Sequence, residues 1–98
     1  MLITKEEIIQ KLKEIKPLLK QKYNLTEIAL FGSYARDEQT EKSDIDIMVD
    51  YNPKTYKGFL YSIDEIEKLF PDKEIQAVIK GGIKPQYFEV LKPDLIYA

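Results

Sequence analysis

Apolar residues in the N-terminal quarter of the chain recur at three- and four-residue spacing. They are Ile8, Ile9, Leu12, Ile15 and Leu19. This spacing predicts an amphipathic helix. Thr4 is its expected N-cap, because Glu7 stands three residues later and can complete a capping box. Pro17 is expected to kink this helix or to split off its last turn.

Three later segments have the pattern of β-strands. Residues 27–33 (EIALFGS) predict a short buried strand that ends in a turn, and residues 44–51 (DIDIMVDY) alternate polar and apolar positions. Residues 74–79 (EIQAVI) predict a third strand. The polar residues 34–43 (YARDEQTEKS) predict a turn of helix followed by a loop.

A second helix and a short C-terminal unit complete the pattern. Pro and Gly in residues 52–58 (NPKTYKG) indicate a loop, after which apolar residues recur at helical spacing from Phe59 to Phe70. Residues 80–98 predict a Gly-rich turn, a short helix and a possible last strand. The order of elements favours an α/β or α+β domain, with a small sheet covered by helices.

Composition narrows the chemistry that this domain can perform. The length of 98 residues suits one domain, 1–98. The net charge of −2 leaves no basic excess to hold a long nucleic acid. A nucleotide neutralised by metal ions remains possible as a ligand. With no Cys and no His, thiol and imidazole chemistry is excluded, and oxygen donors that suit Mg²⁺ remain. No apolar run is long enough for a membrane span and the N-terminus lacks a signal-peptide layout, so we expect a cytoplasmic protein.

Asp44 and Asp46 are unusual because they stand inside an apolar strand pattern. Side chains two residues apart on a strand share a face, so Asp44 and Asp46 should point the same way, with their backbones about 7 Å apart. Ile45, Ile47 and Val49 then point to the other face, into the core. Two such carboxylates repel and raise each other's pKa, and a divalent cation between them relieves the repulsion. The alternative is a solvated face of an antiparallel sheet.

A Gly-Ser pair ends the preceding strand pattern. Gly32 allows backbone N–H groups to approach a phosphate closely, and Ser33 adds a hydroxyl donor at the start of a helix expected near Tyr34. Either residue can also belong to a plain turn. Arg36 can pair with a phosphate oxygen or with neighbouring Asp37 or Glu38. Ser43 can contact a phosphate or bond the backbone before the strand, and we favour the structural role.

Together these residues form the motif GSYARDEQTEKSDIDIMV, a Gly-Ser pair followed about ten residues later by Asp-x-Asp in a strand. The motif resembles the nucleotidyltransferase superfamily that includes DNA polymerase β. The form FGSYAR…SDIDIMVDY is most similar to the minimal nucleotidyltransferase (MNT) family, which includes the MntA-like antitoxins. The resemblance covers nearly the whole chain.

The resemblance implies a nucleotidyltransferase fold, with a small mixed sheet flanked by helices. It implies Mg²⁺-dependent transfer of a nucleotide from ATP, with Asp44 and Asp46 as catalytic metal ligands, two ions if the site is active, and Gly32, Ser33, Arg36 and Ser43 around the nucleotide. Many family members are antitoxins of a HEPN-domain toxin, an RNase, and some add AMP to a tyrosine of that toxin.

The third carboxylate of the family is missing at its expected place. The stretch IQAVIKGGIKP aligns with the family through its IKP segment, and Gln76 then stands where the family has a carboxylate. Gln offers a carbonyl ligand but cannot act as a base. Glu74, two residues earlier on the same strand face, is a possible substitute, or simply a surface charge. The sequence therefore leaves two hypotheses, a working adenylyltransferase and a degenerate domain that neutralises a toxin by binding alone.

Aromatic residues cluster near the loop that follows the Asp-x-Asp strand. Tyr51, Tyr56 and Tyr61 are candidates for stacking on adenine or for a partner surface. The alternative is packing over the second helix, which we expect for Tyr61.

Overall fold

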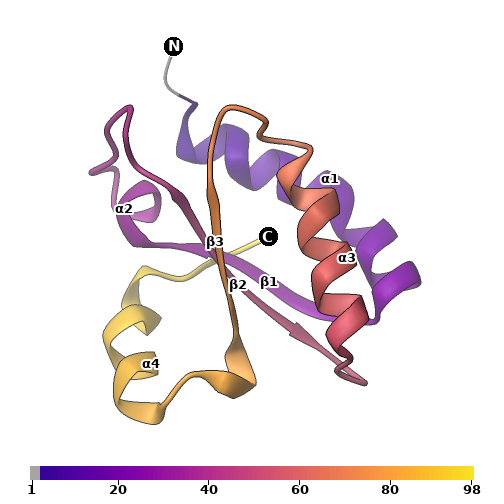
Figure 1. The fold of residues 1–98 in the computed structure, drawn as a ribbon. Helices are drawn as coiled ribbons and strands as arrows, with labels where there is room; N and C mark the ends of the chain where they lie inside the picture. The colour runs from indigo at the N-terminus through magenta and orange to yellow at the C-terminus, as the bar shows by residue number, and fades with distance from the viewer. Residues whose placement is uncertain (1–2) are drawn as a thin grey trace.

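The computed structural model describes residues 3–98 and contains a four-stranded sheet with strand order β3–β2–β1–β4 (Figure 1). β1 is antiparallel to β2 and β4, whereas β2 is parallel to β3. The elements in chain order are α1 (Lys5–Tyr23), β1 (Leu25–Phe31), α2 (Gly32–Ala35), β2 (Ile45–Tyr51), α3 (Tyr56–Glu67), β3 (Ile75–Ile79), η1 (Lys80–Gly82), α4 (Pro85–Leu91), η2 (Lys92–Asp94) and β4 (Ile96–Tyr97). The predicted mixed sheet with flanking helices is confirmed.

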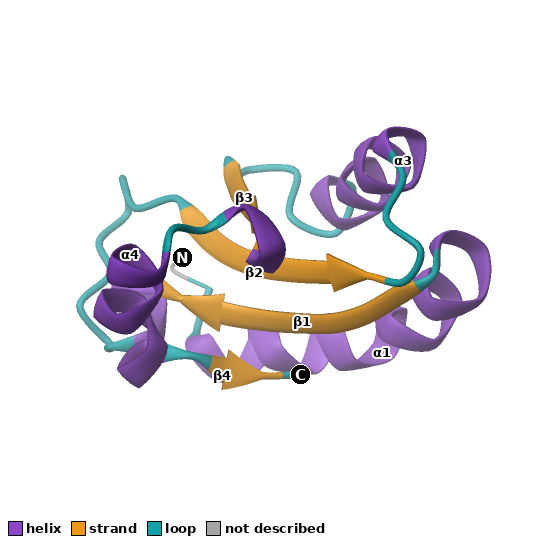
Figure 2. Ribbon diagram, turned by 90° about the horizontal axis from the view of Figure 1, so that it is seen from below, coloured by secondary structure: helices purple, strands orange, loops and turns teal. Residues whose placement is uncertain are grey.

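The hydrophobic core lies between the sheet and the pair of helices α1 and α3. Both helices pack against the core, and Figure 2 shows α1 running along β1 and β4. The residues that form the core in the sheet alternate along β1 and β2, which is the period expected for one buried face. They include Ile28, Leu30, Ile45, Ile47 and Val49. The opposite face carries Asp46 and also the buried apolar residues Ala29 and Met48.

Helix α1 begins as the sequence predicts but does not break at its proline. The Thr4 side chain accepts a hydrogen bond from the Glu7 amide at 3.1 Å, and the Glu7 carboxylate accepts one from the Thr4 amide, which completes the capping box. The helix then continues through Pro17 to Tyr23, so the expected loss of its last turn is wrong. Lys13 and Pro17 are both exposed, and water can therefore bond the Lys13 carbonyl that the proline leaves without a donor.

Helix α3 begins earlier than its apolar pattern indicates. Thr55 is the N-cap, and its hydroxyl accepts a hydrogen bond from the Gly58 amide at 2.9 Å. The predicted loop over residues 52–58 is therefore too long by the first helical turn. The predicted strands also begin one residue too early, since Asp44 and Glu74 lie directly before β2 and β3. The Glu74 carbonyl still accepts a hydrogen bond from the Ile45 amide.

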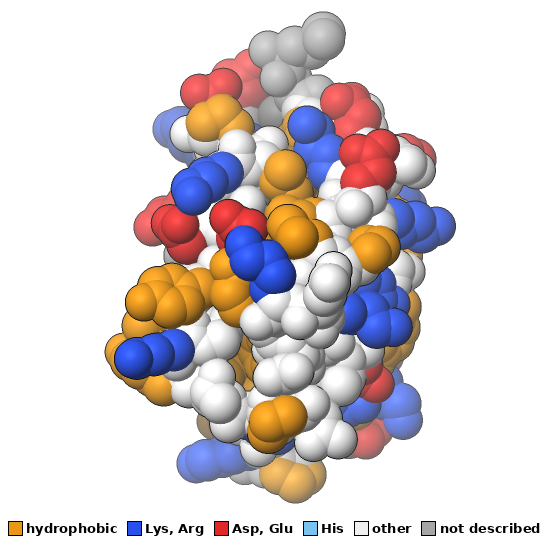
Figure 3. Space-filling model, turned by 90° about the vertical axis from the view of Figure 1, so that its right-hand side faces the viewer, with side chains coloured by type: hydrophobic (Ala, Val, Ile, Leu, Met, Phe, Trp, Pro, Cys, Tyr) orange, Lys and Arg blue, Asp and Glu red, His pale blue; other side chains and the backbone are white. Residues whose placement is uncertain are grey.

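Charged and apolar side chains are interspersed on the surface. On the side shown in Figure 3, no single kind of side chain covers the face. Among residues 3–98, no helix is long and apolar enough to cross a membrane.

Candidate functional site

The two aspartates lie on the face of the sheet opposite the core. In the register of the sheet, Asp46 on β2 is paired with Phe31 on β1 and with Gln76 on β3. Ile45 and Ile47, on either side of Asp46, are completely buried. Asp44 directly precedes β2, two residues from Asp46, and its carboxylate is close enough to act electrostatically on that of Asp46. The two carboxylates therefore act on one another electrostatically, while their joint role in a metal site stays a prediction.

Gly32 brings the Gly-Ser turn directly against Asp46. The glycine has φ +78°, a backbone conformation that favours glycine, and a Cβ atom built at this position would overlap the Asp46 carboxylate. The one-turn helix α2 starts at Gly32 itself, two residues before the expected start near Tyr34. The chain thus places Gly32 beside the Asp46 carboxylate, and Ser33 follows it in the same turn.

The Asp46 carboxylate carries an electrostatic cost that Arg36 offsets only in part. Burial raises its pKa above the ordinary value for aspartate, the neighbouring Asp44 carboxylate raises that pKa further, and Arg36 lowers it. A bound cation would stabilise this arrangement, because it attracts both carboxylates and so offsets their mutual repulsion.

Arg36 is held mainly by other carboxylates. Its guanidinium forms ion pairs with Glu38 at 3.1 Å and with Asp94 at 2.9 Å. Glu38 was one of the two neighbours expected for a surface Arg36, whereas Asp94, at the other end of the chain, could not be found by local spacing. Arg36 therefore joins α2 to η2, and its role toward a phosphate stays a prediction.

Ser43 has the structural bonds that we favoured for it. Its hydroxyl accepts a hydrogen bond from the Thr40 amide at 2.9 Å. Its carbonyl accepts from the Lys73 ammonium at 3.1 Å, and the same ammonium donates to the Glu41 carbonyl at 2.8 Å. Lys73, which sequence reasoning missed, thus holds the loop directly before Asp44. A contact of Ser43 with phosphate stays a prediction.

The third position of the site is occupied by a neutral side chain. Gln76 is exposed on β3 beside Asp46, and Glu74 is exposed one residue before that strand. The Glu74 carbonyl accepts a hydrogen bond from the Ile45 amide at 3.0 Å, so its backbone is fixed next to the start of β2. Within residues 3–98, no three acidic side chains are grouped so that they could hold a metal ion together. Glu74 therefore does not complete such a group in this structure.

An apolar groove with a volume of about 610 Å³ lies between β3, η1 and α4. It begins at Phe31, the residue paired with Asp46. Its lining residues are Phe31, Val78, Ile79, Gly82, Ile83, Lys84, Tyr87 and Leu91. The sequence predicted a turn and a short helix in the region of residues 82–91. No pattern in it indicated that the apolar residues of this segment line a groove.

The tyrosines that the sequence offered for stacking on adenine lie elsewhere. Tyr51 is buried in the core, where its hydroxyl is 2.6 Å from that of Ser62, so it is not available to a ligand. The Tyr61 ring packs 6.4 Å from that of Tyr23, in line with the expected packing role. Tyr56 is exposed at the start of α3 and its role stays open.

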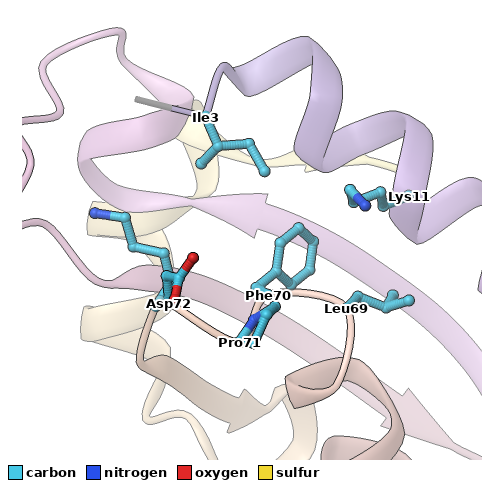
Figure 4. A pocket seen from close by; sticks show the side chains of 7 residues that line it. Ile3, Lys11, Leu69, Phe70, Pro71 and Asp72 are labelled. Atoms are coloured by element: carbon cyan, nitrogen blue, oxygen red, sulfur yellow. The ribbon is translucent and has the colours of Figure 1, made fainter. Parts of the chain in front are cut away.

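A second cavity, of about 250 Å³, lies on the helical side of the molecule. Figure 4 shows the Phe70 ring pointing toward α1, with Ile3 and Lys11 on the helical side of the cavity. Its lining contains neither aspartate of the site nor the Gly-Ser turn. This cavity is therefore separate from the candidate site.

Comparisons with known proteins agree on one family. Residues 12–95 match the family described as "Nucleotidyltransferase domain". A protein of Methanocaldococcus jannaschii named "Putative protein adenylyltransferase MJ0128" is 47% identical over 96 residues, which are 96% of this chain and 97% of that protein. The protein adenylyltransferase MntA of Thermococcus cleftensis is 30% identical over 96 residues, which are 98% of this chain and 97% of that protein.

Solved structures show the same fold at lower sequence identity. A crystal structure of a mutant toxin–antitoxin MntA–HpeT matches with a TM-score of 0.62 and 18% identity, covering 97% of this chain and 71% of that chain. The crystal structure of "a putative nucleotidyltransferase from Sulfolobus solfataricus" matches with a TM-score of 0.57 and 20% identity, covering 95% of this chain and 80% of that chain. With the family match and the relatives above, these structures lead to one conclusion: the chain belongs to the nucleotidyltransferase domain family.

Proposed function

We propose that this nucleotidyltransferase is a protein adenylyltransferase that moves AMP from ATP to a tyrosine hydroxyl of a HEPN-domain toxin, and so acts as the antitoxin of the pair. The observation that carries the proposal is the contact between the Gly32 turn and Asp46, which brings the Gly-Ser pair of the motif against one of its two carboxylates. The names of the relatives support the reaction class. The toxin–antitoxin structure with the same fold supports the kind of partner.

The residues of the site fit one divalent cation. Asp44 and Asp46 supply carboxylate oxygens and Gln76 can add a carbonyl oxygen, which are the donors that Mg²⁺ prefers. The raised pKa of Asp46 supports this assignment, since a cation would relieve the repulsion from Asp44. When bound, Mg²⁺ would supply charge neutralisation for the triphosphate and its leaving group.

Backbone amides and side chains of this protein would position the reactants. The amide groups and hydroxyl of the Gly32–Ser33 turn would hold the β- and γ-phosphates, which places the α-phosphorus beside Asp44 and Asp46. The tyrosine oxygen attacks the α-phosphorus, the bond from that phosphorus to the bridging oxygen breaks, and pyrophosphate leaves. The hydroxyl proton passes to water, because exposed Gln76 offers no base at the third position. Catalysis would then rest on orientation and charge neutralisation.

The apolar groove offers a place for the nucleoside. It starts next to Asp46 at Phe31, and Tyr87 supplies an aromatic ring in its wall. An adenine ring can pack on such a surface, which also keeps the base out of water.

A second candidate function follows from Gln76. A domain that has lost its third carboxylate can retain the fold, bind nucleotide and block a toxin by contact alone. This candidate requires that the partner is bound without being modified.

Both candidates are tested by transfer of label from ATP labelled at the α-phosphate, with Mg²⁺ and a HEPN-domain protein encoded by a neighbouring gene. We expect label on the partner with the wild-type protein and none with Asp44→Ala/Asp46→Ala. Label that appears only with Gln76→Asp would favour the binding function. If no variant transfers label while all of them bind the partner, the transferase proposal is wrong.

A further inference from the structure

Gln76 lies directly beside Asp46, at the position where the family has its third carboxylate. β2 and β3 are parallel neighbours, and Asp46 and Gln76 are partners in their register. Paired residues on adjacent strands point to the same face of a sheet. A side chain at position 76 is thus a direct neighbour of the Asp46 carboxylate, on the open side of the sheet.

Other acidic residues near the site are engaged elsewhere or too far along the chain. Asp94 is paired with Arg36 at 2.9 Å, and Asp50, on the same strand face as Asp46, is 3.3 Å from the Lys54 ammonium. Glu74 is exposed before β3 and belongs to no group of three acidic side chains among residues 3–98. The negative charge of the site therefore comes from Asp44 and Asp46.

From this charge and geometry we infer that the site holds a single divalent cation with its nucleotide, and that Gln76 sets this number. The inference rests on the proposed function, because it concerns the same site. Two cations about 3.5–4 Å apart repel strongly, and sites that bind such pairs require several bridging and flanking anionic ligands. Here the third ligand is a neutral amide, whose oxygen can contact a cation but whose charge cannot offset a second one.

The number of bound ions is measured by titrating Mn²⁺ into the protein with the non-hydrolysable analogue α,β-methylene-ATP, followed by electron paramagnetic resonance. The matched pair of variants is Gln76→Asp and Gln76→Asn, which have side chains of similar size and differ in charge. We expect one Mn²⁺ per chain for the wild type and for Gln76→Asn. We expect two for Gln76→Asp, with the spectrum of a spin-coupled pair of ions, and loss of binding in Asp44→Ala/Asp46→Ala.

Two bound Mn²⁺ per wild-type chain, or none, would overturn the inference. So would one bound Mn²⁺ in both Gln76→Asp and Gln76→Asn. Thermal unfolding of each variant confirms that it is folded before its ions are counted. A wild type that binds one ion but transfers no AMP would refute the catalytic proposal while leaving the inference on ion number intact. A wild type that binds two ions and transfers AMP would refute the inference on ion number while supporting the catalytic proposal.

Discussion

Gly32 is the position at which a small change should have the largest effect on the site. Substituting alanine forces an L side chain into φ +78°, which costs about 1–2 kcal/mol. The new Cβ also overlaps the Asp46 carboxylate, and relieving an overlap in a packed region costs about 1–3 kcal/mol. We therefore expect Gly32→Ala to lower the free energy of unfolding by roughly 2–5 kcal/mol, the sum of these two costs.

The overlap can be separated from the backbone cost by a double-mutant cycle in urea unfolding. In an Asp46→Ala background the carboxylate is absent, so Gly32→Ala should cost only the backbone amount of about 1–2 kcal/mol. Gly82→Ala is the matched control, because a Cβ there meets no atom within 4 Å. Its effect should stay within about 0.5 kcal/mol. Equal losses for Gly32→Ala in both backgrounds would refute the argued contact with Asp46.

Two further predictions concern the charge of Asp46 and the support of the loop before Asp44. The raised pKa of Asp46 means that the folded state binds a proton more readily than the unfolded state, so stability falls as the pH rises through that pKa. Asp46→Asn should therefore be more stable than the wild type at neutral pH and lose this advantage in acid. Urea unfolding of both proteins at the two pH values measures this. A difference in unfolding free energy that is the same at both pH values would contradict the raised pKa of Asp46. Lys73→Met removes the ammonium that bonds the carbonyls of Glu41 and Ser43, which should cost about 1–2 kcal/mol and weaken binding of the Mn²⁺–nucleotide complex beside Asp44. Lys42→Met, at an exposed lysine of the same loop, is the control in calorimetric titration, and equal affinities of the two variants would rule out a positioning role for Lys73.

The local features of the fold could be predicted because they depend on residues close together in the chain. The capping box of Thr4 and Glu7 and the alternation through Asp44 and Asp46 are examples. The start of α3 was missed because its cap at Thr55 lies in a segment rich in Pro and Gly, where loop signals dominate. Of the two outcomes expected at Pro17, the loss of the last helical turn was wrong because the packing of α1 on the core outweighs the loss of one backbone hydrogen bond on its exposed side.

By itself, the sequence determined the spacing of the Gly-Ser pair and the two aspartates, and with it the family resemblance and the candidate chemistry. The family resemblance also indicated Gln76 as the third position, but only the tertiary structure decided how distant residues pair with the motif. Gln76 meets Asp46 through the parallel register of β2 and β3, and Asp94 reaches Arg36 from the far end of the chain. Spacing along a chain is encoded in neighbouring residues, whereas such long-range pairs depend on how strands register and helices pack, which no local pattern specifies.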